Sequence, residues 1–198
     1  MIAVRPVLSD QVILGEGCTV DEGVLLGYLT GRRIDDHTLL IGDGACIRVG
    51  TVIYAGTRIG AGLQTGHNVV IREENEIGDH LNIWNNSTID YGCMIGSGVK
   101  IHCNVYVAQF TVLEDDVFLA PGVVIANDPH PLCGLCMKGP TIKTGARIGV
   151  NVTLLPHITV GEGALIGAGS VVTHDIPPCT VAYGNPARPR KHVDELTC

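Results

Sequence analysis

Polar side chains that could support acid–base or hydrogen-bonding chemistry are concentrated between residues 67 and 128. A carboxylate or imidazole can orient or deprotonate a reacting group, and an amide can position a polar substrate or bind an oxyanion. Several of these side chains recur at intervals of eighteen residues, in a set made of Glu73, Tyr91, Gln109 and Asn127. Glu74 and Asp128 belong to a neighbouring set with the same spacing. Because outward positions can also be merely solvated, it is the clustering that indicates a site.

The interval of eighteen is three times a shorter repeat that runs through most of the chain. From Ile41 to Ile125 every sixth residue is aliphatic except Thr65. A helix repeats every 3.6 residues and a simple strand every two, so neither accounts for a strict period of six. Short repeats of this kind indicate a solenoid whose turns stack on one another. We therefore expect residues eighteen apart to lie in columns, with about 4.8 Å between successive coils.

The six-residue register is interrupted twice, and each interruption predicts a loop. Leu26 and Ile41 are fifteen residues apart, and Ile125 and Ile142 are seventeen apart. Segments of about 28–39 and 127–141 are therefore expected to leave the coil. The aliphatic register itself begins earlier and ends later, with Ile2, Leu8, Leu14, Val20 and Leu26 before the first break and Ile142, Ile148, Leu154, Val160, Ile166 and Val172 after the second.

The chain is expected to form one domain over residues 1–198, closed by a cap over about 175–198. An open solenoid end needs a cover, and the Pro-rich start of this segment, followed by a more polar stretch, predicts a short helix from about Pro186. The net charge of −7 argues against a nucleic-acid surface. No signal peptide or 18-residue apolar stretch is recognisable, which predicts a cytoplasmic protein that does not bind membranes.

Longer motifs resemble those of the hexapeptide-repeat acyltransferases. They are GTVIYAGTRIGAGLQTGHNVVIREENEIGD, KIHCNVYVAQFTVLEDDVFLAPGVVIAND and the closing GNPAR. The resemblance covers nearly the whole chain and implies an all-β fold, the left-handed parallel β-helix. It also implies a homotrimer that binds acetyl-CoA between subunits. Within that superfamily the motifs look most like nucleotide-sugar N-acetyltransferases, which acetylate the amino group of a dTDP- or UDP-linked deoxy-sugar for surface polysaccharide synthesis.

The resemblance gives the polar cluster expected roles. Asn127 and Asp128 match an Asn-Asp pair that enters the active site of related sugar N-acetyltransferases, and Gln109 lies below Asn127 in the predicted column. His102 is the best-placed imidazole for a base. We expect Asn127, Asp128 and His102 to be catalytic. The expected substrate contacts are Glu73, Glu74, Asn85, Gln109, Arg32, Arg33 and Arg72, with the arginines facing the pyrophosphate.

The C-terminal coils offer small residues and cations that would suit acetyl-CoA. Pantetheine could lie against the backbone at Gly145, Ala146, Ala164 and Ala168, although small residues at these positions also suit turns. Arg188, Arg190 and Lys191 could meet the phosphates. In the second loop, His130, Cys133 and Cys136 have the spacing of zinc ligands, but a fourth ligand cannot be placed, so no metal is predicted.

Three other functions are compatible with the same fold. The main alternative is O-acetylation of a sugar or antibiotic, which requires a base to activate a hydroxyl and so would depend on His102. A zinc hydro-lyase resembling the gamma-type carbonic anhydrases would need three histidines across a subunit interface, and the spacing around His102 does not supply them. A non-enzymatic β-helix subunit would need neither the polar cluster nor the loops.

Overall fold

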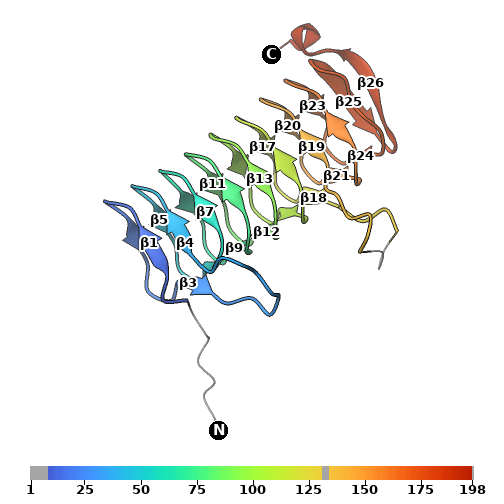
Figure 1. Ribbon diagram of the computed structural model, residues 1–198. Coiled ribbons are helices and arrows are strands. Elements are labelled where there is room, and N and C mark those ends of the chain that lie inside the picture. The colour runs from blue at the N-terminus through green and yellow to red at the C-terminus, as the bar shows by residue number, and fades with distance from the viewer. Residues whose placement is uncertain (1–8, 131–133, 198) are drawn as a thin grey trace.

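The protein forms a parallel β-helix, in which the chain winds through three flat sheets in turn. The computed structural model describes residues 9–130 and 134–197, and Figure 1 shows the coils stacked along one axis from β1 to β25. Strands eighteen residues apart are paired in parallel, for example Glu76 with Met94 and Ile77 with Ile95. The predicted columns and the predicted coil length are therefore confirmed.

Each of the three sheets collects one strand from every coil. Sheet I contains β1 (Val12–Leu14), β4 (Leu39–Ile41), β7 (Arg58–Ile59), β10 (Glu76–Ile77), β13 (Met94–Ile95), β16 (Val112–Leu113), β19 (Thr141–Ile142) and β22 (Thr159–Val160). Sheet II contains β2 (Thr19–Val20), β5 (Cys46–Ile47), β8 (Gln64–Thr65), β11 (Asn82–Ile83), β14 (Lys100–Ile101), β17 (Phe118–Leu119), β20 (Arg147–Ile148), β23 (Leu165–Ile166), β25 (Thr180–Gly184) and β26 (Ala187–His192). Sheet III contains β3 (Leu25–Tyr28), β6 (Val52–Tyr54), β9 (Val70–Ile71), β12 (Thr88–Ile89), β15 (Tyr106–Val107), β18 (Val124–Ile125), β21 (Thr153–Leu154) and β24 (Val171–Val172).

The core is the narrow interior of the coil, filled by the aliphatic residue of each repeat. Ile47, Ile83 and Ile101 are at most 1% exposed. The second inward position, four residues later, carries small or β-branched side chains such as Thr51 and Val105, which are also buried. Small side chains suit this position because the chain turns there between two sheets. The six-residue period thus arises from one strand and one turn per sheet.

Both register breaks produce loops at the expected places. The first loop, residues 29–38, lies between β3 and β4, and the register resumes with Leu14 opposite Ile41. The second loop, residues 126–140, lies between β18 and β19, and the register resumes with Leu113 opposite Ile142. At the N-terminal end Val20 pairs with Ile47, in register, while Ile2 and Leu8 lie outside the described residues.

The C-terminal cap differs from the prediction, because Pro186 does not begin a helix. β26 runs antiparallel to β25, and β25 continues sheet II by pairing in parallel with β23. In the described part of the cap, the only helical turn is Val193–Glu195, which is of the 3-10 type. Pro189 lacks the amide hydrogen that a helix interior requires, whereas an edge strand tolerates its absence. Among the described residues, no helix is long and apolar enough to cross a membrane.

Candidate active site

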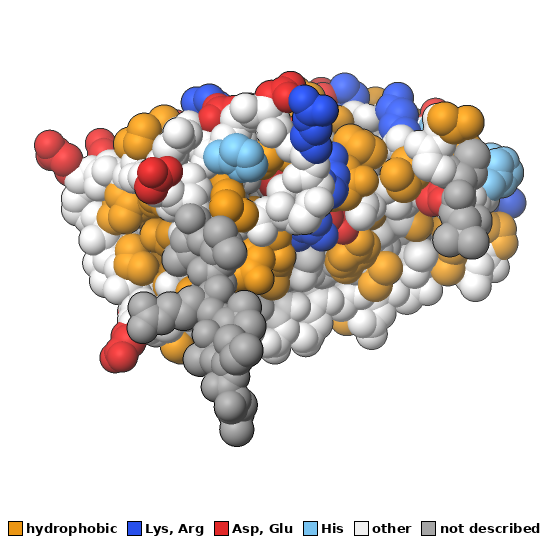
Figure 2. Space-filling model, turned by 60° about the horizontal axis from the view of Figure 1, so that its bottom comes forward, with side chains coloured by type: hydrophobic (Ala, Val, Ile, Leu, Met, Phe, Trp, Pro, Cys, Tyr) orange, Lys and Arg blue, Asp and Glu red, His pale blue; other side chains and the backbone are white. Residues whose placement is uncertain are grey.

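Both loops leave the coil from the same corner, where sheet III passes into sheet I. We call this corner the loop edge. It comprises the first loop, the turns 55–57, 72–75, 90–93 and 108–111, and the second loop. Figure 1 shows the two loops projecting on the same side of the coil. In Figure 2, which brings that side forward, basic and acidic side chains lie close together near the middle of the molecule.

The first loop folds back along the loop edge over the next coils. Ile34 is buried, and Arg58 binds the Asp36 carboxylate at 2.8 Å. Gly56, with a φ of +80°, allows this approach, since a Cβ there would lie 2.8 Å from the carbonyl oxygen of Asp36. The loop is therefore held by an apolar anchor, an ion pair and a close backbone contact.

Glu73 is the buried centre of the site under this loop. Its side chain is fully buried and accepts hydrogen bonds from Thr30 Oγ1 at 3.0 Å, Arg32 Nη1 at 3.0 Å and Arg72 Nε at 2.8 Å. Burial alone would raise the pKa of the carboxyl, but the hydrogen bonds from Arg72, the Glu73 backbone, Arg32 and Thr30 outweigh it and lower the pKa to about 2. Glu73 is thus an ionised anchor for both arginines.

Arg32 connects the first loop to two further turns of the loop edge. Its Nη2 lies 3.1 Å from Glu74 Oε2, and its guanidinium carbon lies 3.6 Å from the centroid of the Tyr91 ring. Arginine stacked on an aromatic face gains a cation–π attraction while keeping its planar donors available. Tyr91 in turn meets Phe110 edge-on, with ring centroids 5.4 Å apart.

A second carboxylate, Asp90, continues the polar network toward the second loop. Arg72 Nη1 lies 3.5 Å from Asp90 Oδ1, which links this carboxylate to Glu73. Tyr106 Oη donates to Asp90 Oδ2 at 2.7 Å, and Gln109 Nε2 donates to the same oxygen at 2.6 Å. Burial, followed by the bond to Asp90, raises the pKa of Tyr106, so its hydroxyl stays protonated as a donor.

The network ends at the start of the second loop. Asn127 Nδ2 donates to Gln109 Oε1 at 2.7 Å, one coil away, and the Asn127 carbonyl accepts from the backbone of Lys138 at 2.8 Å. Asp128 Oδ1 accepts from the backbone N–H of His130 at 2.8 Å. The loop edge therefore presents amides and a carboxylate at fixed positions beside the second loop, which suits the binding and orientation of a polar substrate.

The structure assembles only part of the set predicted from the sequence. Arg32, Arg72, Glu74, Gln109, Asn127 and Asp128 lie on the loop edge, whereas Arg33 is exposed in the first loop and takes no part in the network among the described residues. Glu73 is present but fully buried, so the expectation that it contacts substrate directly is wrong. Its carboxylate instead holds the arginines in place.

His102 and Asn85 lie on a different corner, where sheet II passes into sheet III. The His102 ring stacks on Trp84 with centroids 4.4 Å apart and meets Phe118 edge-on at 5.1 Å. Asn85 Oδ1 accepts the backbone N–H of His67 within the same corner. Within one chain the width of sheet III separates both residues from Gln109, so His102 does not lie beside the amides of the loop edge in the same chain. Six residues lead the chain from one corner to the next. Because His102 and Gln109 are seven residues apart, they lie at neighbouring corners.

The residues expected to line an acetyl-CoA groove do not form one row. Ala146 and Ala164 have no exposed surface and point into the coil, so they cannot line an outer groove. Gly145 lies at the turn between sheets I and II, and Ala168 lies at the turn between sheets II and III. Both alanines follow an aliphatic residue by four, which is the second inward position of the coil.

A groove of about 300 Å³ lies on the outer face of the C-terminal coils in sheet II. It is lined by Phe118, Arg147, Ile148, Gly149, Leu165, Ile166, Gly167 and Ala168. Arg188 and Arg190 are exposed on β26, in the same sheet, and Arg190 lies over the Tyr183 ring at 5.1 Å. Of the residues expected to contact acetyl-CoA, Ala168 lies in this groove, and the exposed arginines of β26 belong to the same sheet.

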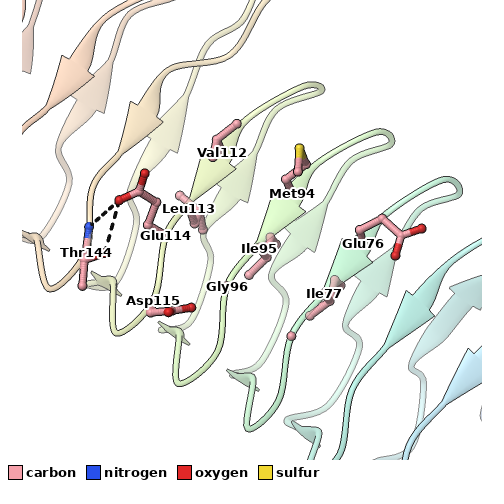
Figure 3. A pocket seen from close by; sticks show the side chains of 11 residues that line it. Glu76, Ile77, Met94, Ile95, Gly96, Val112, Leu113, Glu114, Asp115 and Thr144 are labelled. Carbon is pink, nitrogen blue, oxygen red and sulfur yellow. Dashed lines mark hydrogen bonds between the residues drawn. The ribbon is translucent and has the colours of Figure 1, made fainter.

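A larger groove, of about 630 Å³, lies elsewhere, along the outer face of sheet I. Figure 3 shows Met94 and Val112 on this face, with Thr144 bound to Glu114. Lys143 Nζ also contacts Glu114 Oε1 at 2.6 Å and lowers the pKa of that carboxyl. No residue predicted for catalysis or substrate binding lines this groove.

The zinc candidate cannot be assembled from the described residues. Cys133 lies outside them, and the backbone oxygen of Cys136 lies 2.9 Å from His157 Nε2. No cluster of three or more His, Cys, Asp or Glu side chains suited to a metal occurs within residues 9–130 and 134–197.

Sequence reasoning missed three residues of the network, Thr30, Asp90 and Tyr106. Asp90 follows Arg72 by eighteen residues, so the column of an arginine over an aspartate was a usable signal. Tyr106 is sixteen residues from Asp90 and Thr30 is in a loop, so their contacts depend on the turn and loop geometry.

Comparison with known proteins supports this architecture. Residues 92–127 and 139–174 match the family model of the bacterial transferase hexapeptide (six repeats). A UDP-N-acetylglucosamine acyltransferase from Bacteroides fragilis superposes with a TM-score of 0.78 and 23% identity, over 97% of this chain and 74% of that one. At this identity the likeness concerns the fold alone, and it confirms the expected left-handed β-helix.

Similar sequences include acetyltransferases with different acceptors. Galactoside O-acetyltransferase of Escherichia coli is 34% identical over 116 residues, which is 53% of this chain and 57% of that protein. The dTDP-3-amino-3,6-dideoxy-alpha-D-galactopyranose 3-N-acetyltransferase of Aneurinibacillus thermoaerophilus is 50% identical over 56 residues, which is 28% of this chain and 29% of that protein. The match spans 34% to 60% of the length of the curated relatives that share more than one hundred aligned residues with this chain.

Proposed function

Because the chain carries the bacterial transferase hexapeptide repeat in a left-handed β-helix, we propose that it is an acetyl-CoA-dependent N-acetyltransferase. Its acceptor is the amino group of a nucleotide-linked amino-deoxysugar, of the kind used in surface polysaccharide synthesis. The observation that carries the proposal is the chain of side chains Asp90–Gln109–Asn127 at the loop edge. This series of side chains ends in the amide of Asn127, at the start of the second loop.

An amide can orient an amine but cannot remove the proton of a hydroxyl. A neutral amine is already nucleophilic, so it attacks the thioester carbonyl without prior deprotonation. The new C–N bond forms, the C–S bond breaks, and the proton lost by nitrogen leaves on the sulfur of CoA. A hydroxyl acceptor would need a base in place before attack. The amides of Gln109 and Asn127 therefore favour an amine acceptor.

The nucleotide part of the acceptor would lie along the loop edge toward the first loop. Arg32 and Arg33 are exposed there and can meet a pyrophosphate, with Arg32 already oriented by Glu73 and Tyr91. The 50% identity with a dTDP-amino-sugar N-acetyltransferase over 56 residues supports this class of acceptor.

The sheet II groove would receive acetyl-CoA. Its lining is almost entirely apolar apart from Arg147, which suits pantetheine, and Arg188, Arg190 and Lys191 supply cations for the phosphates. His102 contacts Phe118, which lines this groove, so His102 belongs with the acetyl-CoA side of the site.

A homotrimer would join the two halves of the site. In one chain, sheet III lies between the corner of His102 and that of Asn127. A second copy whose sheet II corner faces the loop edge would place the acetyl-CoA groove of one subunit against the amides of its neighbour. Light scattering of the purified protein measures the subunit number directly.

O-acetylation is the second candidate, and His130 is the observation that favours it. This imidazole is exposed in the second loop, and its backbone is tied to Asp128. The 34% identity with a galactoside O-acetyltransferase also supports a hydroxyl acceptor. His130 could then be the base that a hydroxyl needs.

A thiol-release assay with acetyl-CoA separates the two functions. The acceptor panel contains dTDP- and UDP-amino sugars, the corresponding hydroxyl sugars, a galactoside and serine. Release of CoA with an amino sugar, and not with its hydroxyl counterpart, is the expected result. Release only with hydroxyl acceptors would assign the protein to the O-acetyltransferases, and release with no acceptor would refute the proposal.

A further inference from the structure

Asp90 is the residue on which the central contacts of the loop edge converge. It is only 6% exposed. Its Oδ1 accepts the backbone N–H of Tyr91 at 2.8 Å and lies 3.5 Å from Arg72 Nη1. Its Oδ2 accepts from Tyr106 Oη at 2.7 Å and from Gln109 Nε2 at 2.6 Å. Both oxygens are thus engaged with donors, and one of those donors is the amide that leads to the second loop.

The Asp90 carboxylate fixes the orientation of two side-chain amides, those of Gln109 and Asn127. We call the hydrogen-bonded series Asp90–Gln109–Asn127 the ladder. An ionised carboxylate only accepts hydrogen bonds, so Gln109 must turn its NH₂ group toward Asp90. The carbonyl oxygen of Gln109 then faces the next coil and can be met only by a donor, which is Nδ2 of Asn127 at 2.7 Å. The Oδ1 of Asn127 remains, and within the described residues it accepts no hydrogen bond. The orientation of the last amide is therefore set by a charge two links away.

We propose that Asp90 is a positioning residue that acts through Gln109 to hold the Oδ1 of Asn127 toward the amine of the acceptor. The inference rests on the proposed function for the identity of the acceptor. Asn127 Oδ1 accepts an N–H of the neutral amine, which leaves the nitrogen lone pair free to face the thioester. Asp90 itself does not touch the amine, because both of its oxygens are already bound to donors of Tyr91, Tyr106 and Gln109.

The fixed polarity of the ladder would also select against the wrong donor pattern. If both amides were reversed, Asn127 would present its NH₂ group, which can donate only to the lone pair of the amine and would tie up the electrons needed for attack. Without the carboxylate, no charged acceptor fixes the side-chain amide of Gln109. A half-turn of that amide would exchange the places of its oxygen and its nitrogen. Loss of Asp90 should therefore lower the rate of acetyl transfer to the amine and leave the binding of acetyl-CoA unchanged.

Kinetics of Asp90→Ala test the link to Gln109. We expect kcat with the amino sugar to fall by about 100-fold through misplacement of the amine, with the KM for acetyl-CoA unchanged. In a Gln109→Ala background, Asp90→Ala should cost less than about twofold more, because the link is already broken. Tyr106→Phe, which leaves the Asp90–Gln109 bond intact, should retain most activity. Additive losses in the double variant would overturn the inference.

A matched carboxylate controls for general effects on the coil. Asp79 Oδ1 also accepts a backbone N–H, that of Ala61 at 2.7 Å, but it lies at the corner between sheets I and II. Asp79→Ala should lower the melting temperature to a comparable or smaller extent while kcat stays near that of the wild type. Equal losses of kcat in Asp79→Ala and Asp90→Ala would show a merely structural role.

A spectroscopic measurement keeps the inference testable without turnover. Protein labelled with ¹⁵N-Gln and ¹⁵N-Asn gives side-chain amide signals, which Gln109→Ala and Asn127→Ala assign. Asp90→Ala should shift the signals of both amides, and Asp79→Ala should shift neither. Unchanged Asn127 signals in Asp90→Ala would overturn the positioning role. If Asp90→Ala shifts both signals but the protein acetylates no amine, the proposed function is refuted. The hydrogen-bonded series Asp90–Gln109–Asn127 would still be supported.

Discussion

Gln109 and Asn127 are eighteen residues apart in sequence, and their side-chain amides are joined by a hydrogen bond of 2.7 Å. One of them lies at a regular turn of the coil, and the other is at the start of the loop where the register fails. The bond therefore ties the second loop to the rigid stack of turns beneath it. Rigid support of this kind is what a site needs in order to hold a substrate within reach of a reacting group.

Removing the amide of Asn127 should impair acetyl transfer far more than folding. We expect Asn127→Ala to lower kcat/KM for the amino sugar by about 100-fold, because the amine loses its acceptor, while the KM for acetyl-CoA is kept. Steady-state kinetics with each substrate varied in turn measure both values. Asn82→Ala is the matched control, since the side-chain amide of this sheet II residue donates, among the described residues, only to the His80 carbonyl. A similar loss in both variants would contradict the prediction.

Glu73 should make folding stability depend on pH in the acid range. Its pKa is about 2 in the folded protein, against 4.5 for an unperturbed glutamate. The folded state therefore binds the proton less readily, so the stabilisation is complete above about pH 4.5 and is lost as the pH falls toward about 2. The difference corresponds to roughly 3 kcal/mol of unfolding free energy.

Glu73→Gln tests this with Glu76→Gln as a matched control. Glu76 is exposed, and its contact with Arg58 is 3.7 Å, so its loss should matter little. Urea unfolding at neutral pH should show Glu73→Gln to be less stable by about 3 kcal/mol, since two arginines lose a buried partner. The gap between wild type and Glu73→Gln should narrow as the pH approaches 2. A constant gap would assign the effect to packing rather than to charge.

The sequence predicted the scaffold well because its signal is local and repeated. The strict six-residue step of Ile41, Ile47 and Ile53 is a direct record of one strand and one turn per sheet. The two failures of that step located both loops within a residue or two. The column rule also placed Gln109 under Asn127 correctly.

The sequence predicted the site less well. The eighteen-residue spacing shows which residues stack on one another, but it does not show which residues a loop covers or how far apart two corners lie. Glu73 was expected to be outward, but the first loop folds over it and buries it completely. His102 was expected to act with Asn127 and Asp128, but within one chain it lies at another corner. Ala146 and Ala164 follow their aliphatic residue by four, which is an inward position in this coil. The contacts of Thr30 and Arg32 depend on the path of a loop that has no periodic signal.

Histidine variants should separate acetylation of an amine from acetylation of a hydroxyl. If the acceptor is an amine held by amides, His102→Ala and His130→Ala should each keep kcat within about tenfold of wild type, because loss of a general base costs 10²–10⁴-fold. His157→Ala serves as a control for the second loop, since its imidazole contacts the Cys136 carbonyl. A loss of more than about 100-fold in His130→Ala alone would identify it as a base and favour a hydroxyl acceptor.

The cations of β26 should bind the phosphates of acetyl-CoA. Arg190 is exposed and stacks on Tyr183, which holds its guanidinium beside the sheet II groove next to Gly167. We expect Arg190→Ala to raise the KM for acetyl-CoA by about tenfold, equivalent to about 1.4 kcal/mol, with kcat nearly unchanged. Because the contact is exposed, the difference should shrink as the salt concentration rises.

Two comparisons show whether this effect arises from a phosphate contact. Arg58→Ala removes an exposed arginine of similar setting, paired with Asp36 near the first loop, and should leave the KM for acetyl-CoA unchanged. Acetyl-dephospho-CoA lacks the 3′-phosphate, so if Arg190 binds that group, wild type and Arg190→Ala should use this analogue equally well. If Arg190→Ala still binds the analogue about tenfold more weakly than wild type, the arginine contacts the pyrophosphate instead. If Arg190→Ala changes neither KM, acetyl-CoA does not reach β26, and the sheet II groove would not be its site.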